Sequence, residues 1–408
     1  MRISNNNKFL YFILSMSLMI GLFYGEDSSG SGGSIADFIS TWPLVENPLN
    51  FDCGCEMKFP LHYYIASLIY QISQSEFFLK FTYCIAALAV PILLYKCLEI
   101  KYPKLNKDNL FLFSLIILLL PTFRSAAIWP NTHLTAIIFF LISVYFFLKW
   151  EIKKDYKNLN RELIFTIIFM SLTVYTRQMY AMIFLYFVLI YFQKLKFKDF
   201  LKTCFIIFSF SIPGIIFVFY YPIILTGTFN SNLYNSLLVN SSIISFYLIP
   251  FYFLLFAYNK NRVDLINLKN ITVLFFIILM VWTMSQSFNY NFKMGGGYFL
   301  KLSLIMFDDF YFFYLTSVIG FFLLYLLGKE NPNNVILILL ILFGFSARIL
   351  FPKYFEPMLI ILLFFVFNTK LPQMFLKEKR NIFIYGTYML IYLITGIINH
   401  AFQITKTL

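Results

Sequence analysis

Acidic side chains gather in the longest polar segment of the chain, residues 25–60. The segment holds six carboxylates against one lysine: Glu26, Asp27, Asp37, Glu46, Asp52, Glu56 and Lys58. A positioned carboxylate can take the proton of an attacking hydroxyl group. Asp27 is the first candidate for this general base, because it directly follows an apolar run that would anchor it at a membrane surface. Glu26 and Asp37 are the alternatives, and the simplest reading is that all six acids only solvate a loop.

Basic side chains form a second group of candidates. They lie in segments that we expect on the same side of a membrane as the acidic segment: Arg124, Arg177, Lys293, Lys301, Arg348 and Lys353. An arginine near hydrocarbon is costly unless it finds a partner, and guanidinium groups bind phosphate through paired hydrogen bonds. The sequence therefore predicts a phosphate site facing a carboxylate, although long basic side chains can also simply extend to lipid head groups.

The sequence contains no strong motif for a nucleotide or a metal ion. The chain has neither a Walker A sequence nor a dinucleotide fingerprint, so we expect no nucleotide. Cys53 and Cys55 have no histidine beside them, so we predict no metal site, while a divalent ion is left open. Gly295-Gly296-Gly297 could approach a ligand closely or form only a flexible turn.

The elements that must carry these groups are membrane helices. Of the 408 residues, 60% are hydrophobic and 12% charged, whereas soluble domains are about one quarter charged. Apolar runs long enough to cross a bilayer recur along the chain, which predicts an all-α polytopic membrane protein with about thirteen transmembrane helices. The expected spans are Lys8–Tyr24, Phe77–Tyr95, Leu110–Pro121, His133–Lys149, Leu163–Thr176, Arg177–Tyr191, Cys204–Leu225, Ser242–Ala257, Ile271–Phe288, Phe310–Leu327, Val335–Phe345, Tyr354–Phe367 and Ile382–Ile398.

Lysine-rich and arginine-rich loops predict how the chain crosses the membrane. They fall on alternate sides of the expected spans and are therefore assigned to the cytoplasm: residues 96–107, 149–161, 194–202, 260–269 and 370–380. These loops account for the net charge of +13 without a nucleic-acid partner. The acidic segment is then non-cytoplasmic, in the periplasm or the endoplasmic reticulum lumen.

One integral membrane domain, residues 1–408, is the expected organisation. Residues 25–76 would form its first outer loop, in which Phe59–Ile72 is too short and polar to span and is expected to be an interfacial helix. Phe9–Tyr24 could be a cleaved signal peptide, but no pair of small residues follows it, so we expect an uncleaved span. Richness in Phe, Ile, Lys and Asn suggests an AT-rich genome, which favours a bacterial inner membrane over the endoplasmic reticulum.

Short motifs resemble those of the GT-C glycosyltransferases, polytopic enzymes that use polyprenyl-phosphate or dolichyl-phosphate sugars. The chain is most similar to the dolichyl-phosphoglucose α-1,2-glucosyltransferase family. The similar motifs are Leu120-Pro121 followed by Asn131-Thr132-His133, Thr176-Arg177-Gln178-Met179, and Lys353-Tyr354-Phe355-Glu356-Pro357. Two departures stand out: Glu26-Asp27 is followed by Ser and Gly where the family has an aromatic residue and His, and Met179-Tyr180 replaces Thr-Asn. The motifs therefore support the class more than glucose as the sugar.

The resemblance implies an inverting transfer of a hexose on the non-cytoplasmic face. The partners would be a polyprenyl-phosphate sugar donor, a lipid-linked or glycan acceptor, and membrane lipids. Arg177, Arg348, Lys353 and the neighbouring Tyr354 would contact the donor, and Gln178 and His133 would touch the sugar or the acceptor.

The sequence is also compatible with two functions other than sugar transfer. A flippase for lipid-linked sugars, or another transporter, would need a polar path through the bilayer, and the expected spans hold almost no ionisable residue at mid-depth. A structural subunit of a glycan-assembly complex would need no site at all. Clustering of ionisable residues at one membrane face favours the transferase.

Overall fold

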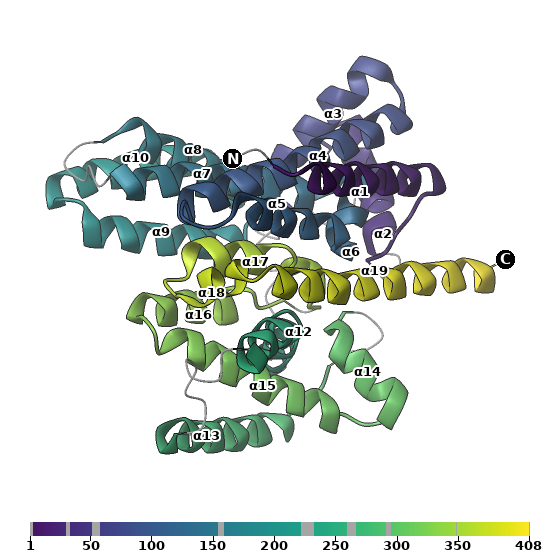
Figure 1. Cartoon of the computed structure of the whole chain (residues 1–408). Coiled ribbons are helices and arrows are strands. Elements are labelled where there is room, and N and C mark those ends of the chain that lie inside the picture. Colours follow the sequence, from purple (N-terminus) through teal and green to yellow (C-terminus); the bar gives the residue numbers. More distant parts are fainter. Residues whose placement is uncertain are drawn as a thin grey trace. The chain divides into compact units, whose positions relative to one another are not determined.

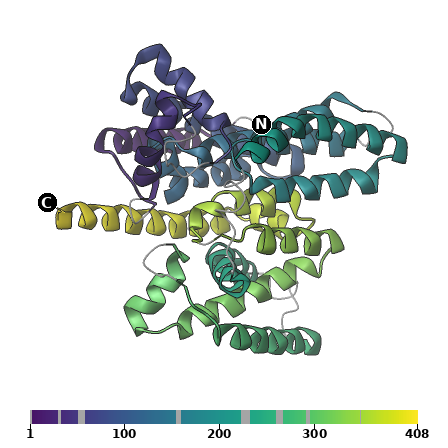
Figure 2. The same cartoon turned by 180° about the vertical axis from the view of Figure 1, so that it is seen from behind.

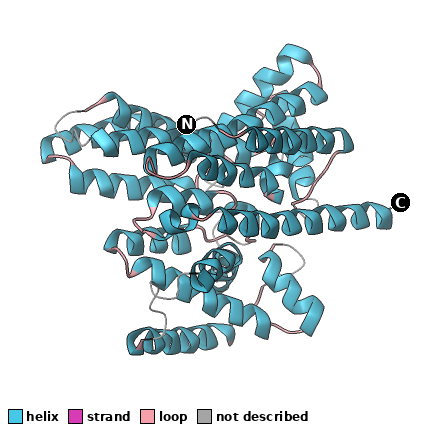
Figure 3. Ribbon diagram, viewed as in Figure 1, coloured by secondary structure: helices cyan, strands magenta, loops and turns pink. Residues whose placement is uncertain are grey.

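The computed structural model describes most of the chain, and it is helical throughout. It describes residues 3–29, 33–50, 58–153, 159–221, 232–258, 267–290, 295–347 and 349–407. Within these ranges there are helices, turns and loops but no strand (Figure 3). This confirms the predicted all-α class.

Eight of the described helices are long and apolar enough to cross a membrane, and the number rises to ten if each of two bent helix pairs is one span. These helices indicate a multi-pass membrane protein. The expected count of thirteen is not confirmed, because several expected spans are short helices here: α8 (Arg161–Val174), α9 (Tyr180–Lys194) and α16 (Pro332–Gly344). Two others correspond to the bent pairs, α5–η1 (Lys107–Leu119) with α6 (Pro121–Ile128), and Pro352–Val366 with α18 (Leu371–Lys377).

Packing divides the chain into two compact units. The first comprises Met1–Ile224 with Gly386–Leu408, and the second comprises Leu225–Tyr385. The division falls within the long helix α19 (Lys379–Thr407). The single membrane domain expected from the sequence stays a prediction.

The first unit is built around α4 (Glu76–Lys101), which packs against α1 (Asn5–Tyr24), α3 (Leu61–Ser73), α5, α6 and α7 (Thr132–Lys153). Its 26 residues extend for about 39 Å, enough to cross a bilayer. Ser75 caps its first turn, and Glu76 and Lys101 complement the helix dipole at the two ends. α7 and α8 lie side by side, as Figures 1 and 2 both show. The remaining helices, α9, α10 (Phe197–Tyr220) and α2 (Gly33–Glu46), complete the unit.

The second unit is built around α12 (Leu233–Tyr258), which packs against α13 (Leu268–Ser285), α14 (Gly297–Phe307), α15 (Tyr311–Gly328), α16, α17 (Met358–Ile361) and α18. The closest approach is to α15, where a Cβ added to Gly320 would lie 2.0 Å from the Ser241 carbonyl oxygen. Ser242 and Thr316 hydrogen-bond across this contact at 2.8 Å. Small residues and hydroxyls at a close contact are typical of helix packing in membranes.

Candidate functional site

The acidic segment begins abruptly because Gly25 ends α1. Gly25 adopts the left-handed conformation (φ 62°), and its N–H bonds to the carbonyls of Gly21 and Leu22. The chain then turns back onto α6. Ser28 Oγ donates to the Pro121 carbonyl at 3.0 Å, and the Ser29 N–H donates to Ser125 Oγ at 2.9 Å. Ser28 and Ser29 are therefore held against the helix that carries Arg124.

Glu26 and Arg124 form a buried ion pair. Arg124 Nε donates to Glu26 Oε1 at 2.9 Å, and Nη2 donates to Oε2 at 2.7 Å, which is the bidentate arrangement. The guanidinium also donates to the Ser17 hydroxyl and carbonyl at 3.0 and 3.1 Å. The Arg124 side chain is 3% exposed and that of Glu26 is 9% exposed. In this arrangement Arg124 binds a carboxylate of the protein rather than a phosphate.

Asp27 is fully buried and anchors α2. Its Oδ2 accepts hydrogen bonds from the backbone N–H groups of Ser34 and Ile35 at 3.1 and 3.0 Å, in the first turn of α2. Its Oδ1 accepts from the N–H and the hydroxyl of Ser29. A carboxylate at a helix N-terminus satisfies N–H groups that have no partner within the helix. Taking a proton would require Asp27 to give up one of these four bonds.

The other acidic candidates differ in exposure. Asp37 is half-buried on α2, one turn beyond its start, and its carbonyl accepts from Ser40 and Thr41. Glu46, at the exposed end of α2, accepts from Trp42 Nε1 at 2.8 Å. Asp52, Glu56 and the Cys53–Cys55 pair lie outside the described residues. Of the three candidate bases, Asp27 is buried, whereas Glu26 and Asp37 keep partial exposure, and Glu26 is paired with Arg124.

Hydrogen-bond donors gather at the N-terminus of α7. Asn131 Oδ1 accepts from the His133 N–H at 2.9 Å and so caps the helix. Arg177 lies in the turn between α8 and α9, is 4% exposed, and its Nη1 contacts the imidazole ring of His133. Asn131 Nδ2 is buried without a hydrogen-bond partner among the described residues. Gln178 follows in the same turn and is half-buried.

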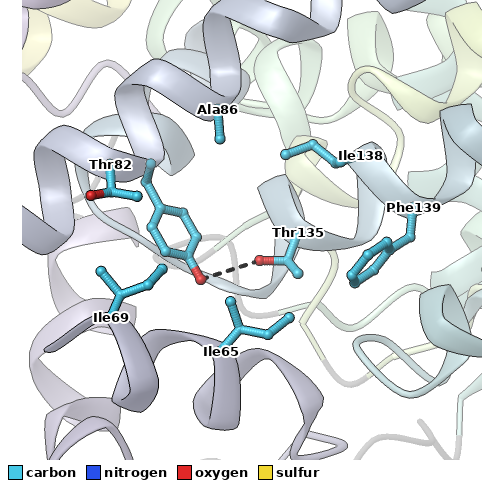
Figure 4. A pocket seen from close by; sticks show the side chains of 8 residues that line it. Ile65, Ile69, Thr82, Ala86, Thr135, Ile138 and Phe139 are labelled. Carbon is cyan, nitrogen blue, oxygen red and sulfur yellow. Dashed lines mark hydrogen bonds between the residues drawn. The ribbon is translucent and has the colours of Figure 1, made fainter. Parts of the chain in front are cut away.

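A polar network that the sequence did not indicate lies beside this group. His62 lies in the first turn of α3, and its Nδ1 lies 2.8 Å from Thr135 Oγ1 on α7 and 3.1 Å from the Tyr83 hydroxyl on α4. Burial lowers the pKa of His62 to about 3, which keeps the ring neutral. Tyr83 and Thr135, together with Thr82 and five apolar residues, also line a cavity of about 150 Å³ between α3, α4 and α7 (Figure 4).

The second unit holds the remaining basic candidates. Lys353 and Tyr354 lie in η2 (Pro352–Tyr354), where the Lys353 Nζ is 4.8 Å from the centre of the Phe351 ring. Beside them Glu356, missed as a candidate, is 3% exposed and accepts from the Tyr247 hydroxyl at 2.7 Å. Only a helix-packing argument that placed α12 next to this segment could have identified it. Lys293 and Arg348 lie outside the described residues.

The Gly295-Gly296-Gly297 run is packed rather than open. All three residues have φ between 69° and 81°, a region that side chains rarely adopt. A Cβ on Gly295 would lie 2.5 Å from the Leu350 carbonyl oxygen, which also accepts from the Gly296 N–H at 2.7 Å. The run therefore serves a close backbone contact within the second unit.

The described side chains fall into separate groups rather than into one site. Glu26 is joined to Arg124, Asp27 to α2, and Arg177 to His133. Lys353 and Tyr354 belong to the second unit. No group of three or more His, Cys, Asp and Glu side chains that could hold a metal occurs within the described ranges.

Comparison of the chain with protein-family models, curated proteins and solved structures gave no match. The functional argument therefore depends on the residues and their geometry.

Proposed function

We propose that this protein is a membrane glycosyltransferase that takes a hexose from a polyprenyl-phosphate donor on the non-cytoplasmic face of a bacterial inner membrane. The GT-C fold with about thirteen spans belongs to this proposal. The observation that carries it is the group of donors at the N-terminus of α7: His133, Arg177 and the buried Asn131 Nδ2.

An anion suits this group for three physical reasons. The N-terminus of a 22-residue helix carries partial positive charge and N–H groups without helical partners. A guanidinium in contact with an imidazole places several N–H donors side by side, and an anion can accept from more than one of them. A buried amide N–H₂ group without a partner is costly, and a phosphate oxygen could accept from it.

The proposed reaction is a single displacement. The acceptor hydroxyl oxygen attacks the anomeric carbon, the bond from that carbon to the donor phosphate oxygen breaks, and the electron pair leaves with the lipid phosphate. A carboxylate of the first loop takes the hydroxyl proton. We assign this step to Asp37, which keeps partial exposure, and an anchoring role to Asp27, whose lone pairs are occupied.

The arrangement of α2 and α3 supports this assignment. α2 carries Asp37 and packs against α3. The first residue of α3, Leu61, donates its N–H to the Tyr175 carbonyl at 3.3 Å, two residues before Arg177. One helix therefore borders both the acidic segment and the turn that carries the proposed phosphate ligand.

Binding of a polyprenyl phosphate to the purified full-length chain tests the phosphate site. Arg177→Ala should weaken binding by about ten- to a hundredfold, the range for a hydrogen-bonded charge. Arg161→Ala is the matched control, because exposed Arg161 begins α8, at the opposite end from the turn that carries Arg177. Equal affinity of wild type and Arg177→Ala would refute the phosphate role.

Transfer is tested with labelled polyprenyl-phosphate hexoses in vesicles, measured as sugar lost from the lipid. Asp37→Asn should abolish the loss, and Asp27→Asn should in addition lower the unfolding temperature. Loss of activity in Asp27→Asn alone, at normal stability, would return the base to Asp27. Movement of intact donor across the vesicle membrane without bond cleavage would instead identify a transporter.

A further inference from the structure

Tyr175 follows α8 directly and contacts two further parts of the first unit. Its carbonyl accepts from the Leu61 N–H at the start of α3, and its ring meets that of Phe59 edge-on, with the centroids 5.8 Å apart. Its hydroxyl reaches α10. Arg177 lies only two residues further along the chain, in the turn that Tyr175 begins.

The hydroxyl of Tyr175 binds α10 at a weak point of that helix. Pro213 has no N–H, so the ladder of hydrogen bonds is already interrupted there. The hydroxyl donates to the Phe210 carbonyl and accepts from the Gly214 N–H at 3.1 Å. In a regular helix Gly214 would donate to Phe210, so one side chain bonds to both members of that pair, an insertion that bends helices.

Gly214 gives the ring of Tyr175 room to approach. A Cβ at this position would lie 2.8 Å from Tyr175 Cε1, closer than packed atoms come. The buried residues of α10 are few among those described: Asp199, Thr203 and Gly214. Gly214 is the one in the second half of the helix, where Phe217 also packs against Phe59 with the ring centroids 5.8 Å apart.

We infer that Tyr175 is a positioning residue for Arg177: it fixes the turn after α8 between α3 and α10, so that the guanidinium faces the N-terminus of α7. This inference rests on the proposed function. A ligand-binding side chain must be held to within about half an ångström of its working position. The bonds from Tyr175 to α3 and α10 hold the backbone two residues before Arg177.

The test measures affinity for a polyprenyl phosphate together with the thermal unfolding temperature of full-length protein in lipid nanodiscs. Tyr175→Phe keeps the ring and removes the hydroxyl, so affinity should fall by about three- to tenfold, the value of one or two hydrogen bonds. Tyr220→Phe is the matched control, because it removes a hydroxyl from a 72% exposed tyrosine of α10, the helix that Tyr175 contacts. That variant should bind like wild type.

Gly214→Ala provides an independent route to the same displacement, because its methyl group collides with the ring. It should weaken binding in the same direction even if Tyr175→Phe folds poorly. The Tyr175→Phe/Gly214→Ala double variant should lose less than the sum of the two single effects, since both act on one contact.

The outcomes separate the two proposals. Wild type that binds no polyprenyl phosphate refutes the proposed function and, with it, this inference. Wild type that binds, with a loss in Arg177→Ala but none in Tyr175→Phe and Gly214→Ala, overturns the inference alone. Lower unfolding temperature with unchanged affinity would also overturn it, because a purely structural tyrosine would give that result.

Discussion

Replacement of Arg124 by methionine should destabilise the protein strongly, because it leaves the Glu26 carboxylate buried without its cation. The two side chains are 3% and 9% exposed and share two short hydrogen bonds. The hydroxyl of Ser28, which donates to Glu26 Oε1 at 3.1 Å, would remain. Removing one partner of a buried ion pair costs about 3–5 kcal/mol. We expect a loss of this size for Arg124→Met.

The double variant Glu26→Met/Arg124→Met separates the pair from its surroundings. It removes both charges, and apolar replacements of buried pairs are often close to neutral. The double variant should therefore cost less than Arg124→Met alone, and the coupling between the two positions should be about 3 kcal/mol or more. The measurement is unfolding in mixed micelles, followed by helical circular dichroism.

Lys96→Met provides the control for the Arg124 experiment. Lys96 pairs with Glu99 at 2.9 Å, but its side chain is 55% exposed, so its loss should cost less than about 1 kcal/mol. Additive costs for Glu26→Met and Arg124→Met would refute the reasoning. The same result would leave Arg124 available for the phosphate role that its sequence position suggests.

Two further predictions concern His62 and Gly320. The folded pKa of His62, about 3, lies below the ordinary 6.5, so the unfolded chain binds one more proton between these values and stability falls as pH drops through this range, by up to about 1.4 kcal/mol per pH unit. Unfolding measured from pH 7 to 4 should show a smaller slope for His62→Gln, and parallel curves would contradict this. Gly320→Ala should cost about 1–3 kcal/mol by forcing α15 away from Ser241, 2.0 Å from the added Cβ. The control Gly386→Ala has its nearest neighbour at 3.9 Å and should be neutral, and equal unfolding of both variants would exclude the close contact.

The hydropathy of the sequence predicted the helices that consist of long apolar runs. α1 (Asn5–Tyr24) and α4 (Glu76–Lys101) overlap the expected spans Lys8–Tyr24 and Phe77–Tyr95, and α3 (Leu61–Ser73) confirms a short helix at Phe59–Ile72. Long apolar runs need little information beyond their own residues, because a helix satisfies all of its backbone groups internally.

α2 was missed because its start resembles a linker. The Ser-Gly sequence of residues 28–34 is typical of a flexible linker. The side chain that caps the helix, Asp27, is several residues away in sequence. Phe38 and Val45, seven residues apart and both buried, are the signal of a helical face that could have revealed it.

The Glu26–Arg124 pair could not have been predicted from spacing. The two residues are 98 positions apart, and their meeting depends on how α6 packs against the end of α1. Sequence position could place both groups near one membrane surface but could not choose between a protein carboxylate and a lipid phosphate as the partner of Arg124. Arg177 contacts His133, a group that can itself become a cation.

Structural roles of the acidic residues decide how any activity measurement must be read. Glu26 neutralises Arg124, and Asp27 holds the first turn of α2, so replacing either one displaces the helix that carries Asp37. An inactive Asp27 variant is therefore expected whether or not Asp27 touches substrate. Only the combination of unfolding temperature, polyprenyl phosphate affinity and sugar release distinguishes these cases. A base in the reaction should change sugar release alone, whereas an anchor should change stability first and the other two through it.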